Sequence, residues 1–128
     1  MNRKAITAES APDAIGPYSH AMRAGNILYL SGQIALDPST MELVTDSFRK
    51  ETKQVFANIR AVLEAAGASL KDVVKMTVYL TDLSNFDTVN AVMSETLQYP
   101  FPARVAVGVS ALPRGASIEI ETIAFLED

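Results

Sequence analysis

The longest regular pattern in the chain is a series of apolar residues between positions 48 and 66 that recur at steps of three, four and seven. This spacing places them along one face of an α-helix. The series consists of Phe48, Val55, Ile59, Val62, Leu63 and Ala66. Mostly charged residues occupy the other side, as expected where a helix lies on a sheet, and Gly67 is a typical helix stop. We therefore predict an amphipathic helix over residues 48–66.

A second, shorter helix is predicted to begin at Ser84. The Ser84 side chain can cap free backbone N–H groups, and Asp87 adds a favourable negative charge in the first turn. The apolar stripe of this helix consists of Phe86, Val89, Met93 and Leu97. Pro100 and Pro102 follow the stripe, and we expect them to end the helix because proline cannot continue its hydrogen-bond ladder.

Extended runs, some with alternating apolar and polar residues, predict strands in the rest of the chain. The strands are expected over residues 20–24, 27–31, 74–80, 103–109 and 117–125. Gly25-Asn26 separates the first two strands and is a recognised signal for a tight hairpin. In the third, the residues expected on one apolar face are Val74, Met76, Val78 and Leu80.

These elements follow one another in the order ββ-α-β-α-ββ, which predicts an α+β fold: a single mixed β-sheet with two helices on one face. The last strand is apolar on both sides, with Ile118 and Ile120 on one and Ile123 and Phe125 on the other. Two helices cover only one face, so we expect another copy of the chain to bury part of the other face. The sequence therefore predicts a homo-oligomer.

Length and composition fit one domain over residues 1–128, with 48% hydrophobic and 20% charged residues. Fifteen acidic and 11 basic side chains give a net charge of −4, which disfavours a nucleic-acid partner. No apolar run approaches the ~18 residues of a membrane span, and the N-terminus lacks a signal-peptide pattern. We therefore expect a soluble, cytoplasmic protein that binds neither nucleic acid nor membrane.

The chain contains no cysteine and a single histidine, His20. The lack of cysteine excludes disulfides, zinc–thiolate sites and a thiolate nucleophile. One histidine disfavours a histidine-rich metal site and a Ser–His–Asp triad. We expect no metal, and a structural or surface role for His20.

Arg104 stands in an otherwise small and apolar strand, on the face that also carries Ala106 and Gly108. A guanidinium in such a place needs an anionic partner. That partner is either a carboxylate of the protein itself or a ligand in the space that the small neighbours leave.

Other polar residues are also candidates for a site. Glu119 and Glu121 share one face of the final strand, an arrangement that is costly if both are buried and ionised and without consequence if both face water. Asn90 falls within the apolar stripe of the second helix, so its amide either bonds to backbone or points at a pocket. Tyr18 and Ser31 carry hydroxyl groups at strand ends, where their role is either structural or functional.

Five segments of the chain resemble the signature blocks of the RidA family, also called YjgF. They are Ile15-Gly16-Pro17-Tyr18-Ser19, Ser31-Gly32-Gln33, Asp87-Thr88-Val89-Asn90, Pro102-Ala103-Arg104 and Ile118-Glu119-Ile120-Glu121. The resemblance implies a chorismate-mutase-like fold and a homotrimer with clefts between its subunits. It also implies hydrolytic deamination of reactive 2-imino and enamine acids to 2-keto acids and ammonia, with no cofactor.

The resemblance further implies roles for individual residues. Arg104 would bind the substrate carboxylate through a bidentate pair, and Glu119 would orient or deprotonate the attacking water. The other substrate-binding residues would be Tyr18, Ser31, Gly32, Asn90 and Ala106. Ala106 departs from the family's pattern because cysteine is common there, and residues 97–101 form a shorter segment than is typical. The substrate range is therefore open.

Two other functions remain as alternatives. A non-catalytic trimer that binds small carboxylates as a regulator would use Arg104 without turnover, although Glu119 nearby would weaken its affinity for anions. An endoribonuclease, an activity ascribed to some family members, is disfavoured by the net charge of −4 and the single histidine.

Overall fold

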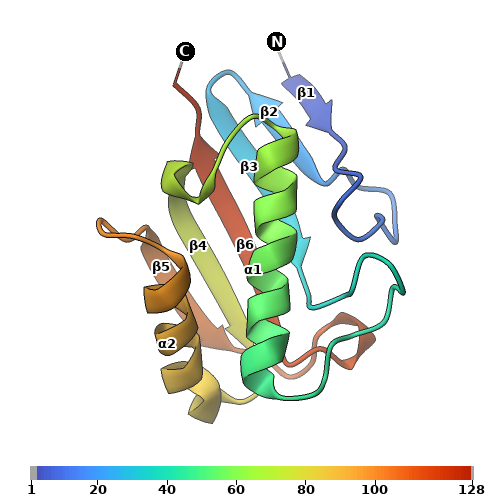
Figure 1. The fold of residues 1–128 in the computed structure, drawn as a ribbon, viewed down its shortest axis with the longest axis vertical. Coiled ribbons are helices and arrows are strands. Elements are labelled where there is room, and N and C mark those ends of the chain that lie inside the picture. Colours follow the sequence, from blue (N-terminus) through green and yellow to red (C-terminus); the bar gives the residue numbers. More distant parts are fainter. Residues whose placement is uncertain (1–2, 128) are drawn as a thin grey trace.

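The structure, a computed structural model, describes residues 3–127 and consists of one six-stranded sheet with two α-helices on the same face (Figure 1). The strands are β1 (Arg3–Ile6), β2 (Ala21–Ala24), β3 (Ile27–Gln33), β4 (Val73–Leu80), β5 (Ala103–Gly108) and β6 (Ile118–Phe125), and the helices are α1 (Phe48–Ala65) and α2 (Phe86–Thr96). Short 3-10 turns cover Leu70–Asp72, Leu83–Asn85 and Pro113–Gly115. None of the helices in the described region is long and apolar enough to cross a membrane.

The sheet is mixed, as predicted. Its strand order is β1-β2-β3-β6-β4-β5, in which β4 and β5 run parallel and all other neighbours antiparallel. The predicted element order was wrong in one respect, because it lacked β1. That strand lies at the edge of the sheet and buries only Ile6, so its sequence has no alternating pattern to detect.

Helix α1 confirms the prediction for residues 48–66 closely. Ser47 caps it by accepting a hydrogen bond from the N–H of Lys50 at 3.1 Å. At the other end Ala66 is the C-cap, and Gly67 adopts a positive φ of 78°, which suits glycine. Of the apolar face of α1, Val55, Ile59, Val62 and Leu63 are fully buried, and the two end residues Phe48 and Ala66 are partly buried.

The predicted start of the second helix was wrong. Asp82 caps a 3-10 turn that precedes the helix: its Oδ1 accepts hydrogen bonds from the Ser84 N–H at 2.9 Å and from the Ser84 hydroxyl at 2.7 Å, whereas Asn85, the N-cap of α2, makes no side-chain cap bond. Helix α2 itself begins at Phe86. It ends at Thr96, several residues before Pro100, so that Leu97 lies just past the helix but is still buried.

The two faces of the sheet differ in what covers them. Met76, Val78 and Leu80 of β4 are fully buried beneath the helices, together with Ile118 and Ile120 of β6. The residues between them point the other way, onto the face that α1 and α2 leave uncovered, which we call the open face. Its residues include Tyr29, Tyr79, Val105, Val107, Glu119, Glu121 and Phe125.

Val74 was expected among the buried residues of β4 but is 47% exposed. The pairing of β4 with β6 shifts register between Val73 and Lys75, so Val73 is the buried residue instead. On the open face, Tyr29 is 50% exposed, Val105 44% and Phe125 42%. Because water-exposed apolar groups of this size are costly, the open face is suited to contact with another chain.

Candidate functional site

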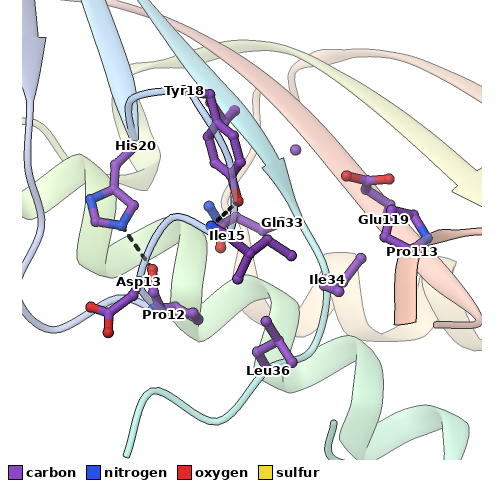
Figure 2. A pocket seen from close by; sticks show the side chains of 12 residues that line it. Pro12, Asp13, Ile15, Tyr18, His20, Gln33, Ile34, Leu36, Pro113 and Glu119 are labelled. Atoms are coloured by element: carbon purple, nitrogen blue, oxygen red, sulfur yellow. Dashed lines mark hydrogen bonds between the residues drawn. The ribbon is translucent and has the colours of Figure 1, made fainter. Parts of the chain in front are cut away.

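A cavity of about 380 Å³ lies where β3 ends, beneath the loop that precedes β2 (Figure 2). Four of the predicted site residues line it, namely Tyr18, Ser31, Gly32 and Glu119. Much of the remaining wall is apolar and includes Ile15, Ile34, Leu36 and Pro113. We call this cavity the Glu119 pocket.

His20 fixes the loop that covers the Glu119 pocket. The buried imidazole accepts a hydrogen bond from the Ala8 N–H at Nδ1, 2.9 Å away, so Nε2 carries the proton and donates to the Pro12 carbonyl at 2.7 Å (Figure 2). Both ring nitrogens are thus occupied by backbone groups. The prediction was a structural or a surface role for His20, and the structure shows the structural one.

The two predicted hydroxyl groups are held by the same loop. The Ser31 hydroxyl donates to the Ser19 carbonyl at 2.5 Å, and the Tyr18 hydroxyl accepts from the Ile15 N–H at 3.1 Å (Figure 2). Each hydroxyl keeps hydrogen-bonding capacity beyond these contacts, because a hydroxyl can both donate and accept. Both groups therefore remain able to contact a ligand in the pocket.

Glu119 is half-buried and packs directly against Gly32. A Cβ added at Gly32 would overlap Glu119 Oε2 and would lie 3.0 Å from Cδ. Burial raises the pKa of the Glu119 carboxyl above its ordinary value, and the negative charge of Glu121 raises the pKa further. Glu121 in turn accepts a hydrogen bond from the Tyr79 hydroxyl at 3.1 Å. A carboxyl in this position can exchange a proton closer to neutral pH than an ordinary glutamate.

The sequence analysis missed Glu51, which fixes the start of the strand that carries Glu119. Its buried carboxylate accepts a hydrogen bond from the Ser117 N–H at 2.8 Å and so ties α1 to β6. A signal was available, because Glu51 lies three residues after Phe48 and four before Val55, on the apolar side of the helix.

Arg104 and Asn90 form a second group of predicted residues. Arg104 Nη1 donates to Asn90 Oδ1 at 2.6 Å and contacts Met93 Sδ at 3.5 Å, and the guanidinium lies 4.8 Å from the centre of the Phe86 ring. The three partners of Arg104 come from α2, whereas Arg104 itself lies in β5. Arg104, Asn90 and Met93 line a cavity of about 230 Å³. Within residues 3–127 Arg104 forms no ion pair with a carboxylate, so the internal ion pair considered from the sequence is absent there.

The structure does not bring Arg104 and Glu119 together within one chain. Arg104 is opposite Met76 in the sheet and Ala106 is opposite Val78, which places both on the helix-covered face. Glu119 points to the open face instead. The predicted site residues are therefore divided into two half-sites, one around Glu119 and one around Arg104.

The Glu119 pocket also contains a polar residue that the sequence analysis left without a role. Gln33 belongs to the block Ser31-Gly32-Gln33 and lines the pocket, although it is only 6% exposed.

As for metals, no group of three His, Cys, Asp or Glu side chains within the described residues is placed to hold one.

Comparisons with known proteins agree with this fold. A family model described as Endoribonuclease L-PSP matches residues 8–126. A RutC family protein of Pyrococcus abyssi is 51% identical, covering 99% of this chain and 100% of that protein. A 2-iminobutanoate/2-iminopropanoate deaminase of Dermatophagoides farinae is 46% identical, covering 98% of each chain. RidA from an Antarctic Psychrobacter species has a TM-score of 0.93 at 50% identity, covering 96% of this chain and 99% of that one.

The chain therefore belongs to the family that this model describes. That family is the RidA or YjgF family, and relatives in it carry the name of an imine deaminase.

Proposed function

We propose that this protein hydrolyses reactive 2-imino acids to 2-keto acids and ammonia. The observation that carries the proposal is the half-buried Glu119 carboxyl, whose pKa is raised by burial and by Glu121 in a pocket with apolar walls. A carboxyl of this kind can take a proton from water and return it during the same reaction. The name carried by the Dermatophagoides farinae relative agrees with this chemistry.

The reaction needs few groups from the protein, because the C2 carbon of a protonated imine is already electrophilic. Arg104 would hold the substrate carboxylate through its guanidinium fork, with Asn90 and the Phe86 ring keeping the fork in place. Glu119 would take a proton from the attacking water as the new C–O bond forms. It would then give that proton to the nitrogen and, as the C–N bond breaks, take the proton of the new hydroxyl while the C=O bond forms, so that ammonia leaves and the keto acid remains.

We further propose that the working site forms between two copies of the chain, in a homotrimer. Glu119 lies on the open face and Arg104 on the other side of the sheet, in β5, which is an edge strand. A neighbouring copy whose β5 edge approaches the open face would bring its Arg104, Asn90 and Ala106 to the Glu119 pocket. The exposed Val105 and Phe125 of the open face would be buried by the same contact.

The test is the rate of 2-keto acid release from an imino acid generated in situ by an amino-acid oxidase. We expect wild type to accelerate release, and Arg104→Ala and Glu119→Ala to lose most of that acceleration. Wild-type rates equal to the buffer control with several imino acids would refute the deaminase proposal. Binding of a 2-keto acid without turnover would then favour the carboxylate-binding regulator.

Ribonuclease activity is the weaker alternative despite the description of the family model. Metal-free RNA cleavage requires general acid and base groups, a role that histidine commonly fills. The single histidine, His20, is buried and uses both ring nitrogens for backbone hydrogen bonds. The net charge of −4 also opposes RNA binding.

A further inference from the structure

Gln33 is a buried polar side chain without a protein partner. It is 6% exposed, and its amide makes no hydrogen bond to the rest of the region 3–127. Asn58, a buried amide of comparable depth, is committed to the protein: it donates to the carbonyls of Ile34 at 3.1 Å and Leu36 at 2.9 Å, and accepts from Gln54 at 2.9 Å. Within residues 3–127 Thr122 Oγ1 is the side-chain polar atom that is fully buried without a partner, so the amide atoms of Gln33 still reach the water of the pocket and are free to hydrogen-bond a ligand there.

The uncommitted amide of Gln33 can meet a ligand in the Glu119 pocket, which Gln33 lines (Figure 2). Gln33 is paired with Ile120, a residue of the helix-covered face, whereas Glu119 belongs to the open face. The two side chains therefore enter the pocket from different sides of the sheet. A ligand whose reacting carbon lies at Glu119 would extend its other end toward Gln33.

The surroundings of Gln33 define the chemistry of that end. The neighbouring pocket walls are formed by Ile15, Ile34 and Leu36, which favour an apolar stem. The pocket lining includes the carboxyl groups of Asp13 and Glu119 but no lysine or arginine, so a second carboxylate on the ligand would be repelled. A carboxamide both donates and accepts hydrogen bonds and is matched best by another neutral group that does the same.

We propose that Gln33 is a specificity-determining residue that hydrogen-bonds a neutral polar group on the substrate side chain. This inference rests on the proposed function, because it concerns the same pocket. The substrates it favours are 2-imino acids with a carboxamide side chain. They are preferred over imino acids of equal size whose side chain is apolar or acidic.

The imino acids derived from asparagine, leucine and aspartate provide the test, because their side chains have nearly the same shape. Each is generated in situ by a suitable oxidase, and kcat/KM is measured for wild type and for Gln33→Met, which keeps the length of the side chain but removes the amide. The control is Gln54→Met, the same change on α1, at a residue that lines neither the Glu119 pocket nor the cavity beside Arg104.

Wild type is expected to prefer the asparagine-derived imine over the other two. In Gln33→Met the ratio of asparagine to leucine kcat/KM should fall about tenfold, the loss expected for one hydrogen bond in a desolvated site. Gln54→Met should leave the ratio unchanged. An equal loss on both substrates in Gln33→Met would assign Gln33 a structural role and overturn the inference, while the deaminase proposal would stand.

A binding measurement separates this inference from the deaminase proposal. Calorimetry compares the stable keto acids 2-oxosuccinamate and 4-methyl-2-oxopentanoate on wild type and Gln33→Met. Wild type could turn over no imine and still bind 2-oxosuccinamate more tightly than 4-methyl-2-oxopentanoate. If Gln33→Met then loses that preference, recognition by Gln33 stands although the deaminase proposal fails. Equal affinities for the two keto acids in wild type would overturn the inference.

Discussion

Replacing Gly32 with alanine should disable the Glu119 carboxyl without disturbing the fold. The added Cβ would lie 3.0 Å from Glu119 Cδ and 3.2 Å from Cγ, and would overlap Oε2. Carbon atoms in contact prefer about 3.5–4.0 Å, so the carboxyl has to move by ~0.5–1 Å. A displacement of about 1 Å in a catalytic group can cost on the order of 100-fold in rate. We therefore expect Gly32→Ala to lower kcat/KM for imine hydrolysis about 100-fold.

The stability of the fold should change little. Gly32 is exposed and its φ lies outside the left-handed region, so alanine fits the backbone. Gly-to-Ala changes at such positions commonly stabilise by about 0.4–1 kcal/mol because they restrict the unfolded chain. The melting temperature should therefore be equal to that of wild type or slightly higher.

The control is the same change in a Glu119→Ala background. Gly32→Ala should have little further effect there, because the displaced group is already missing. A Gly32→Ala variant with wild-type kcat/KM would refute the argument that the position of Glu119 limits the reaction.

Two further changes test stability. Asn58→Ala leaves the carbonyls of Ile34 and Leu36 without their donor and should lower the free energy of unfolding by ~2–4 kcal/mol, as measured by urea titration. Gln54→Ala keeps those two bonds and should lower the free energy of unfolding by less than ~1 kcal/mol. The pKa of Glu119 is raised in the folded state, so the folded protein favours the neutral carboxyl. This contribution to the free energy of unfolding is complete below the ordinary pKa of a glutamate, ~4.3, and is lost as the pH rises through the raised pKa. Glu119→Gln should therefore raise the melting temperature at pH 8 but not at pH 4, and an equal rise at both would contradict the assigned pKa direction.

The sequence predicts the helices and the central strands because burial leaves a periodic pattern there. The stripe from Val55 to Leu63 in α1 is one example, with every apolar member fully or almost fully buried. Strand β1 leaves no such pattern, since Ile6 is its only buried residue. The cap was misassigned because Asp82, Ser84 and Asn85 all have side chains that can cap a helix; the path of the chain makes Asp82 the cap of the 3-10 turn and Asn85 the N-cap of α2 without a side-chain bond.

The candidate site was predictable as a set of residues but not as an arrangement. The alternation within β5 correctly placed Arg104 on one face with Ala106, and the alternation within β6 placed Glu119 with Glu121. Neither pattern tells which face of the sheet the helices cover. That Arg104 and Glu119 lie on opposite faces follows only from the pairing of both strands with β4. The position of Glu51 on the apolar side of α1 indicates its burial, but its partner Ser117 is far away in the sequence and no local pattern reveals it.

The central claim is that Arg104 of one copy and Glu119 of another serve the same site, and a subunit-mixing experiment tests it most directly. Arg104→Ala and Glu119→Ala, each inactive alone, are unfolded together in equal amounts and refolded, and native mass spectrometry verifies that mixed oligomers form. If each site takes its arginine and its glutamate from different copies, random mixing leaves both intact in about a quarter of the sites, so about a quarter of wild-type activity should return. Activity that stays at the level of the separate variants in verified mixed oligomers would contradict a shared site.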